Sequence, residues 1–338
     1  MLNSMKTNIK TTHSYNNTKK IKNWSEYNKS LKNRGNLSIF ISESIIKDGR
    51  IVFPKKTGKV GRPKKYTDEF IEFALSVREL FRLPFRQTIG LIEYLFSLMG
   101  LSTDDLPDYT TLSRRMPSLN VRYYSSNTHD KNGVVMLIDS SGFKVFGEGE
   151  WMVRKHGATY RRTWRETHIA LDYKTRDIIG FINTSAHVHD NTQLKPLLSQ
   201  VMNQNGYEVD TVIGDGAYDA NDNYKLSKRL GIKFLAPLRK DAVEHLNSFH
   251  YQVYDTPGWE ERNAVVRHVE EFGLDGWKAD VDYGRRSLVE NAFYRWKTIF
   301  GGNLKSRKTD TQFTEQCLRA KIINNFNKIG LPKYELAS

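Results

Sequence analysis

Two short apolar runs that each end in an aspartate set the strongest limit on how this chain folds. The run "GVVMLID" ends at Asp139, and the run "DTVIGD" ends at Asp215. Runs of this length and apolarity are typical of strands that are buried on both faces of a sheet. Three further runs, "THIALDY", "DIIGFINTSA" and "IKFLAPL", have the pattern of strands, and the short connection of "DIIGFINTSA" favours an antiparallel neighbour for that strand. We therefore expect an α/β domain with a mixed sheet flanked by helices.

The positive charge of the chain is concentrated in an N-terminal arm. The 338 residues carry a formal net charge of +14, and residues 1–65 hold thirteen lysines and three arginines against three acids. Basic arms usually contact nucleic acid, although a solvated, disordered tail is the alternative. We predict a disordered basic tail over residues 1–22, a basic arm and linker over 23–66, a helical region over 67–125, and an α/β domain over 130–330 with an insertion near 240–280.

The helical region has the pattern of a helix-turn-helix-like DNA-binding module. Thr67 is placed to cap a first helix, a second is predicted over residues 85–99, and a short third helix begins near Thr110. The third helix carries Arg114 and Arg115, which we predict to contact DNA. A small helical bundle that does not touch DNA is the alternative.

The linker before this region offers one more candidate DNA contact. Its Gly61-Arg62-Pro63 sequence, flanked by lysines, resembles the core of an AT-hook, an extended arm that fits narrow minor grooves. Arg62 is therefore a candidate DNA-binding residue, although a plain linker would have the same composition.

Cysteine content and hydropathy exclude several classes of protein. A single cysteine, Cys317, excludes a disulfide framework, and no CxxC pair suggests a zinc finger. No apolar run approaches the roughly 18 residues that a membrane helix needs. We expect a soluble, cytoplasmic protein.

The two strand-end aspartates favour a divalent metal site. In α/β sheets, groups at the carboxyl ends of strands line the site crevice, so we expect Asp139 and Asp215 to lie side by side. Neighbouring carboxylates repel each other unless a divalent cation neutralises them, and Mg²⁺ prefers such oxygen ligands. Glu290 is the single acid of the basic stretch Tyr283–Lys297, and it would complete the set. The alternative is that each acid is an ordinary turn or ion-pair residue.

Tyr283, Arg286, Glu290 and Lys297 share one stripe of the helix predicted over this stretch. At about 100° per residue their side chains fall within a sector about 60° wide, and the apolar residues occupy another face. Glu290 would bind a metal while Arg286 and Lys297 bind DNA phosphates beside it. Neither cation can be a metal ligand, so metal affinity should not depend on them. An Arg286–Glu290 ion pair is the simpler alternative.

Two smaller patterns suggest other chemistries. Tyr283 as a covalent nucleophile, as in tyrosine recombinases, would need a mostly helical catalytic domain rather than a strand-rich one. His187, His189 and Asp190 have the spacing of metal ligands, but Asp190 and Gln193 also match a capping box for the helix that follows. A polar strand end followed by a helix cap is the more common reading of that cluster.

Asp139, Asp215 and Glu290 resemble the DDE triad of bacterial insertion-sequence transposases, whose catalytic core is RNase H-like. The chain also has the Y-x₂-R-x₃-E-x₆-K signature of the IS-five group, with Tyr283 and Lys297 at its two ends. The stretches "VIGDGAYD" and "PDYTTLSRR" are similar to that group as well. The resemblance covers about residues 23–330.

The resemblance implies a metal-dependent DNA transposase. Such an enzyme cleaves the ends of its own insertion sequence and transfers the freed 3′-hydroxyl ends to target DNA. It implies that the triad binds two divalent ions, Mg²⁺ or Mn²⁺, and that these ions serve two-metal-ion phosphodiester chemistry. It also implies double-stranded DNA as partner and a homodimer or higher oligomer as the active assembly. A non-catalytic DNA-binding regulator derived from a transposase is the alternative.

Overall fold

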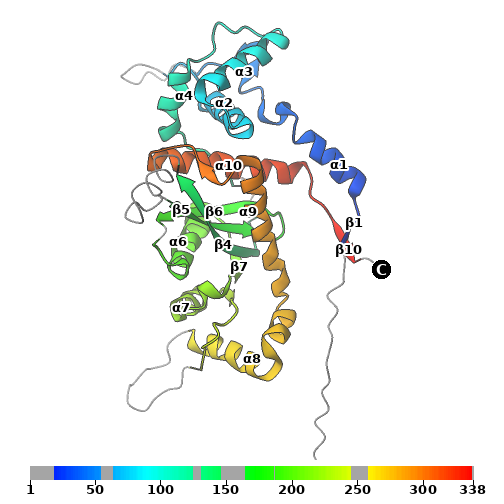
Figure 1. Ribbon diagram of the computed structural model, residues 1–338, viewed down its shortest axis with the longest axis vertical. Helices are drawn as coiled ribbons and strands as arrows, with labels where there is room; N and C mark the ends of the chain where they lie inside the picture. The colour runs from blue at the N-terminus through cyan, green and yellow to red at the C-terminus, as the bar shows by residue number, and fades with distance from the viewer. Residues whose placement is uncertain are drawn as a thin grey trace, which may run out of the picture.

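A mixed sheet of six strands forms the centre of the computed structural model (Figure 1). The structure describes residues 19–54, 64–124, 131–145, 164–185, 187–244 and 258–336. The strands are β4 (Val134–Val145), β5 (Trp164–Asp172), β6 (Ile178–Ser185), β7 (Val209–Ile213), β8 (Lys233–Leu235) and β9 (Asn303–Leu304). Their order is β6-β5-β4-β7-β8, and β9 pairs with the end of β4. β5 is antiparallel to β4 and β6, whereas β7, β8 and β9 continue in parallel, so the predicted mixed α/β sheet is confirmed.

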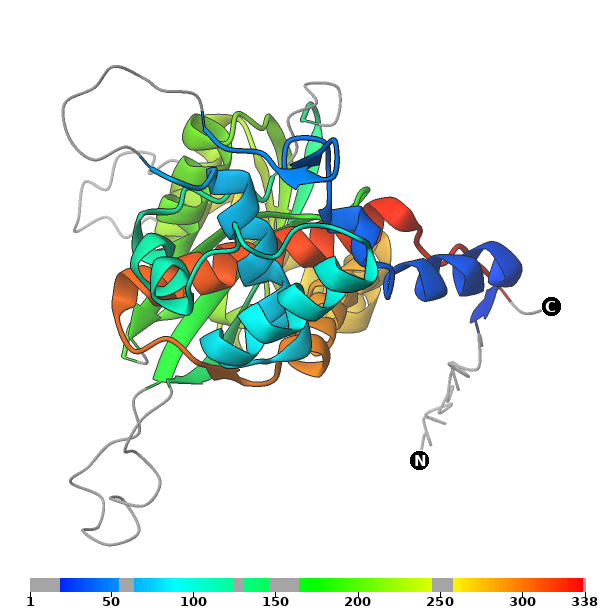
Figure 2. The same cartoon turned by 90° about the horizontal axis from the view of Figure 1, so that it is seen from above.

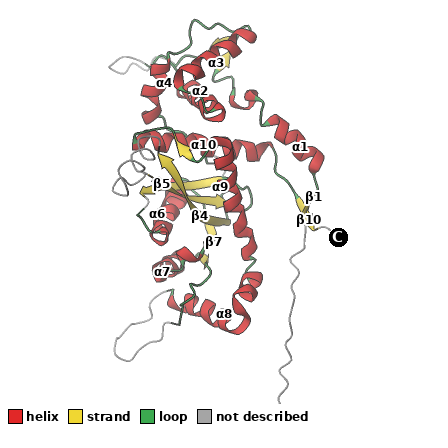
Figure 3. Ribbon diagram, viewed as in Figure 1, coloured by secondary structure: helices red, strands yellow, loops and turns green. Residues whose placement is uncertain are grey.

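Helices cover the sheet on both sides (Figure 3). Successive residues of a strand point to opposite faces, so both faces carry side chains that pack against helices. The ring of Phe143 in β4 lies 5.9 Å from that of Trp296 in α9. On the other side, a Cβ at Gly180 of β6 would come within 2.6 Å of Val201, so only glycine permits this close approach. The covering helices are α6 (Leu194–Leu198), the π-helix η5 (Ser199–Gln204), α7 (Asn221–Leu230), α9 (Ser287–Phe300) and α10 (Thr309–Ile329).

The predicted helical region packs against α10. It contains α2 (Asp68–Phe81), α3 (Phe85–Leu98), α4 (Tyr109–Arg115) and the 3₁₀ turn η2 (Met116–Ser118). The Thr67 hydroxyl accepts a hydrogen bond from the Phe70 amide at 3.1 Å, as expected of the cap of α2. Between α2 and α10 the guanidinium of Arg319 is fully buried, donates to Glu79 at 2.9 Å and also pairs with Glu315. A buried ion group therefore joins the helical region to the α/β domain.

The two ends of the described chain meet beside the main body (Figure 2). Strand β1 (Lys19–Ile21) pairs antiparallel with β10 (Tyr334–Leu336), and α1 (Trp24–Asn33) follows β1. The predicted disordered tail over residues 1–22 therefore includes a short strand, and its first 18 residues lie outside the described ranges. The rest of the arm forms η1 (Leu37–Phe40) and a hairpin of β2 (Ile46–Lys47) and β3 (Arg50–Ile51).

The stretch predicted as an insertion contains a long helix that its sequence did not indicate. Helix α8 spans Trp259–Asp280, and its backbone leaves the helical region at Gly273, where φ is 75°. The kink explains why no single helical period runs through this stretch, because the two halves present their faces in different directions. Residues 245–257 lie outside the described ranges, and the status of this stretch as an insertion stays a prediction.

Two predicted helix starts differ in the structure. The helix expected from Tyr283 begins as the 3₁₀ helix η7 (Tyr283–Arg286), and α9 starts only at Ser287, so uniform 100° spacing does not apply to Tyr283. The capping box at Asp190 is wrong: this residue opens the 3₁₀ helix η4 (Asp190–Gln193), and its carboxylate accepts a hydrogen bond from Ser140 instead. Within the described ranges, no helix is both long and apolar enough to cross a membrane.

Candidate active site

Asp139 and Asp215 lie at matching positions of two parallel strands, but only Asp215 follows the end of its strand. β4 continues beyond Asp139 to Val145, so the prediction that Asp139 ends a strand is wrong. β4 and β7 are parallel neighbours in which Leu137 is level with Ile213, and each aspartate follows two residues later. Asp215 caps the 3₁₀ helix η6 (Gly216–Tyr218) by accepting the Ala217 amide at 3.0 Å. The guanidinium of Arg286 reaches both carboxylates, so they lie near each other, as the sequence predicted.

Arg286 brings Glu290 into the same group. Its guanidinium donates to Asp139 Oδ1 at 3.0 Å and to Glu290 Oε1 at 2.5 Å, and it lies 3.6 Å from Asp215 Oδ2. The side chains are 16% exposed at Asp139, 35% at Asp215 and 58% at Glu290. Three acids from β4, the loop after β7 and α9 therefore converge on one cation, with Asp139 at the protected end and Glu290 at the solvent end.

The charges of this group act on Asp139 and Tyr283. Burial raises the pKa of Asp139 to about 6; Arg286 opposes the rise, and the charges of Asp215 and Glu290 add to it. Burial likewise raises the pKa of the Tyr283 phenol to about 12, so this hydroxyl keeps its proton at neutral pH. It donates to the backbone carbonyl just before Asp215 at 3.0 Å. Tyr283 thus acts as a neutral donor that fixes the loop carrying Asp215.

Lys297 approaches the site from the next two turns of α9. Its ammonium donates to the Ser141 hydroxyl at 2.6 Å and lies 5.4 Å from the centre of the Phe143 ring. The opposite face of α9 is buried against the sheet, as predicted, through Val289, Ala292, Phe293, Trp296 and Phe300. All four residues of the predicted stripe therefore lie around the middle of β4 and the loop after β7, even though Tyr283 lies on a different kind of helix.

The predicted DNA contacts of the N-terminal part have different surroundings. Arg114 is exposed and donates to Thr110 within its own helix at 3.1 Å. Arg115 is only 15% exposed: it donates to the Tyr66 carbonyl at 3.1 Å and pairs with Asp68, which ties α4 to the start of α2. Arg62 lies outside the described residues.

A second group of polar side chains next to Asp139 escaped the sequence reasoning. The Ser140 hydroxyl lies 3.2 Å from Glu166 of β5 and 3.0 Å from Asp190 of η4. His168, two residues after Glu166, is fully buried beside Asp190. The available signal was the spacing of Glu166 and His168, because residues two apart in a strand share one face.

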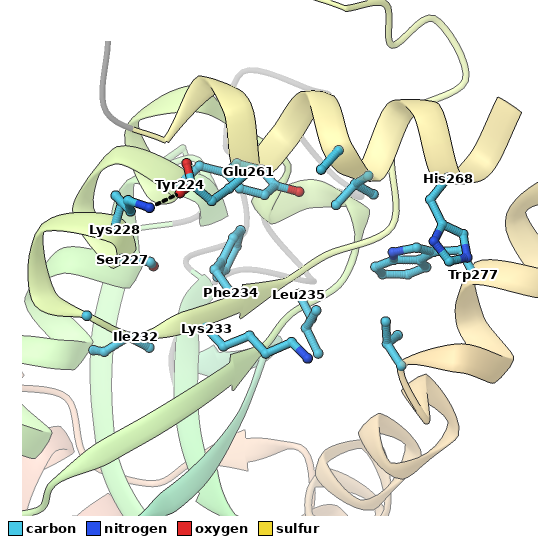
Figure 4. A pocket seen from close by; sticks show the side chains of 14 residues that line it. Tyr224, Ser227, Lys228, Ile232, Lys233, Phe234, Leu235, Glu261, His268 and Trp277 are labelled. Carbon is cyan, nitrogen blue, oxygen red and sulfur yellow. Dashed lines mark ion pairs between the residues drawn. The ribbon is translucent and has the colours of Figure 1, made fainter. Parts of the chain in front are cut away.

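A cavity of about 540 Å³ lies elsewhere, between α7, β8 and α8 (Figure 4). Its wall is largely apolar and includes Tyr224, Phe234 and Trp277, together with an ion pair between Lys228 and Glu261. None of the three converging acids lines it. The largely apolar cavity lacks the three converging acids, so we place the candidate active site at Asp139, Asp215 and Glu290 instead.

Comparison with known proteins identifies the family. Two models of the transposase DDE domain match the chain, one over residues 32–148 and the other over residues 130–326. The second match spans more than half of the chain and includes all three converging acids. The chain belongs to the DDE transposase family.

Individual proteins similar to this DDE transposase are distant. An uncharacterized protein of Aquifex aeolicus is 24% identical over 232 residues, which cover 63% of this chain and 68% of that protein. Among solved structures, the Drosophila P element transposase strand transfer complex matches 90% of this chain and 86% of its own at 13% identity. Its TM-score is 0.30.

The acids of this DDE transposase fit a divalent ion by their chemistry. Carboxylate oxygens are the ligands that Mg²⁺ and Mn²⁺ prefer, and the three acids already gather around one positive charge. That charge is the guanidinium of Arg286. Among the described residues, no group of three or more His, Cys, Asp or Glu side chains is arranged to hold a metal ion directly. The carboxylates would therefore have to exchange Arg286 for the ion.

Proposed function

We propose that this DDE transposase cleaves the ends of its own insertion sequence and joins the freed 3′-hydroxyl ends to target DNA. Asp139, Asp215 and Glu290 would be the metal-binding catalytic residues. The observation that carries the proposal is their convergence on Arg286 from three separate elements. When bound there, two divalent ions supply charge stabilisation to the attacking and leaving oxygens of an in-line displacement.

The sheet supports an RNase H-like classification of the core. Three antiparallel strands, β6, β5 and β4, continue into the parallel strands β7 and β8, with Asp139 on the central strand and Asp215 just after its parallel neighbour. The Y-x₂-R-x₃-E-x₆-K spacing supports membership of the IS-five group. In this structure each residue of that spacing has a contact at the site, which gives the spacing a physical reason.

The cations around the triad would bind the DNA backbone. Lys297 donates a hydrogen bond to Ser141, and Arg286 contacts the three acids. Both cations are therefore positioned at the site in the absence of DNA. Once divalent ions neutralise the acids, the Arg286 guanidinium would be free to donate to a phosphate beside them. Tyr283 would keep the Asp215 loop in place rather than form a covalent bond.

Recognition of the element ends would fall to the helical region and the basic arm. The exposed Arg114 on the short helix α4 suits contact with DNA in a helix-turn-helix-like arrangement, whereas the contacts of Arg115 suit a structural role. Arg62 and the lysines around it would add contacts to the backbone or minor groove. The partner would be double-stranded DNA, and the active form would be a homodimer or higher oligomer that holds two ends.

The deciding experiment is metal-dependent nicking of DNA that carries the element's own ends. The purified protein should nick such DNA in Mg²⁺ or Mn²⁺, and Asp139→Ala, Asp215→Ala and Glu290→Ala should each abolish nicking while DNA binding persists. Asp210→Ala is a matched control, because Asp210 is an exposed acid on β7 away from the triad. DNA binding without nicking by the wild type would favour a non-catalytic regulator. Full activity of any triad variant would remove that residue from the site.

A further inference from the structure

Asp139 has a second acidic group behind it, on the opposite face of β4. Ser140 follows Asp139 in the strand, so its side chain points the other way. Its hydroxyl lies 3.0 Å from Asp190 Oδ2 and 3.2 Å from Glu166 Oε1. A hydroxyl has one proton and can donate to only one of them at a time. The shorter contact makes Asp190 the principal acceptor.

Two buried side chains, His168 and Tyr218, lie beside Asp190 without a hydrogen bond to it. The His168 side chain is fully buried, its Nε2 lies 3.0 Å from the Thr184 hydroxyl, and its Nδ1 lies 3.7 Å from Asp190 Oδ1. Burial lowers the pKa of His168, so the ring is neutral and does not balance the acid. Tyr218 is buried beside both acidic groups, and within the described chain its hydroxyl has no hydrogen-bond partner.

This arrangement is costly for a purely structural contact. Two carboxylates close to one hydroxyl repel each other, and burial together with the charge of Asp190 raises the pKa of Glu166. An apolar contact between β4 and η4 would hold the same elements together without that penalty. What Asp190 adds is a directional hydrogen bond to the residue next to Asp139.

We propose that Asp190, acting through Ser140, is a positioning residue for Asp139. The proposal rests on the proposed function of Asp139 as a metal-binding residue. Ser140 and Asp139 share a peptide unit, so anchoring one side chain restricts the backbone rotation that would swing the other carboxylate. The Ser140–Asp190 hydrogen bond lies on the opposite side of the strand from the contact between Arg286 and Asp139, so β4 is held from both faces at this point. Asp190 would contact neither DNA nor metal.

The test compares variants of the full chain in the nicking assay. Asp190→Ala and Ser140→Ala should each lower kcat about 10- to 100-fold, as losses of residues that orient metal ligands commonly do, with KM for DNA little changed. The double variant should be no slower than the slower single variant, because both remove the same interaction. Asp190→Asn should keep most of the activity, since its amide oxygen can still accept the Ser140 proton.

A readout without DNA separates this inference from the proposed function. Titration of the apo-protein with Mn²⁺ should give about tenfold weaker binding for Asp190→Ala and Ser140→Ala. Thr167→Ala is the control: it removes hydrogen bonds with Asn183 and Gln316 and leaves the Ser140–Asp190 contact intact, so it should lower stability without weakening Mn²⁺ binding. If Asp190→Ala does not fold, Ser140→Ala, which loses a single oxygen, carries the same comparison.

The outcomes are distinct. A wild type that neither nicks DNA nor binds Mn²⁺ would overturn the proposed function, and this inference with it. A wild type that does both, with Ser140→Ala and Asp190→Ala unchanged in kcat and Mn²⁺ affinity, would overturn only the positioning role. Asp190→Asn as impaired as Asp190→Ala would also overturn it, because charge rather than the hydrogen bond would then be what matters.

Discussion

Replacing Arg286 with alanine should strengthen divalent metal binding in the absence of DNA. The guanidinium donates to Glu290 at 2.5 Å and to Asp139 at 3.0 Å, and it lies 3.6 Å from Asp215. A divalent ion needs the same oxygens, so Arg286 competes with it. This reverses the expectation from sequence, which held metal affinity independent of Arg286 because a charged guanidinium cannot be a ligand. Arg286 can compete with the metal ion for the carboxylates without itself being a ligand of the metal.

The size of the effect follows from how exposed each contact is. Glu290 is 58% exposed, so its ion pair contributes at most about 1 kcal/mol. The contact with Asp139, which is 16% exposed, is a hydrogen bond between charged groups and contributes about 1.5–3 kcal/mol. Hydration of the displaced guanidinium returns part of this free energy. A net gain of about 1–2 kcal/mol corresponds to metal binding about 5- to 30-fold tighter in Arg286→Ala.

The assay is a titration of the protein with Mn²⁺ at pH 8, in which the electron paramagnetic resonance signal of the free ion measures how much Mn²⁺ remains unbound. Burial raises the pKa of Asp139 to about 6, and Arg286 opposes that rise. Removing Arg286 raises this pKa further, so protons compete with the metal more strongly near pH 6, and the gain should shrink as the pH falls. Lys297→Ala is the matched control, since Lys297 donates to Ser141 rather than to an acid. Binding in Arg286→Ala that is no tighter than in this control would refute the competition.

Three further outcomes are expected. Tyr283→Phe should slow nicking by a modest factor, because the hydroxyl holds a loop carbonyl at 3.0 Å; complete loss, or a trapped covalent DNA adduct, would make it a nucleophile. Glu79→Ala should lower the free energy of unfolding in urea by about 3–5 kcal/mol, because it takes a buried partner from Arg319; a loss below 1 kcal/mol would contradict this. Arg114→Ala should lower the slope of log DNA affinity against log salt by about 0.9, because it removes one phosphate contact. Arg115→Ala should lower the stability of the fold and leave that slope unchanged, so equal slopes for the two variants would contradict the different roles of these arginines.

The parts of the site that depend on local pattern could be predicted from the sequence. Asp139 and Asp215 each end an apolar run, and neighbouring parallel strands bring matching positions side by side, so their proximity followed, although β4 continues beyond Asp139. The apolar face of α9 followed from its period, and that face left Glu290 directed towards the edge of the sheet. These inferences needed only the repeat of a strand or helix and the general geometry of α/β sheets.

The parts that depend on which side chains meet could not be predicted in this way. Asp190 has the sequence context of a helix cap, and only the approach of η4 to β4 makes Ser140 its partner. Arg115 has the context of a DNA contact, but the packing of α4 on α2 commits it to Tyr66 and Asp68. In both cases a polar side chain had a plausible local role, and a partner distant in sequence overrode it.

The contacts of α2 with α9 and α10 join the helical region to the helix that carries Glu290. Arg82 ends α2 in the left-handed conformation, with φ of 54°, and its guanidinium donates to the carbonyls of Thr298 and Ile299 at 2.7 and 3.0 Å. Carbonyls in the last turn of a helix lack partners within it, so this cation stabilises the end of α9. Glu290 is on the first turn of that same helix. With Arg319 also buried between α2 and α10, the helical region cannot shift against the α/β domain without breaking buried ion pairs. The module that we propose to bind the element ends is therefore joined by direct contacts to the helix that supplies the third acid of the proposed triad.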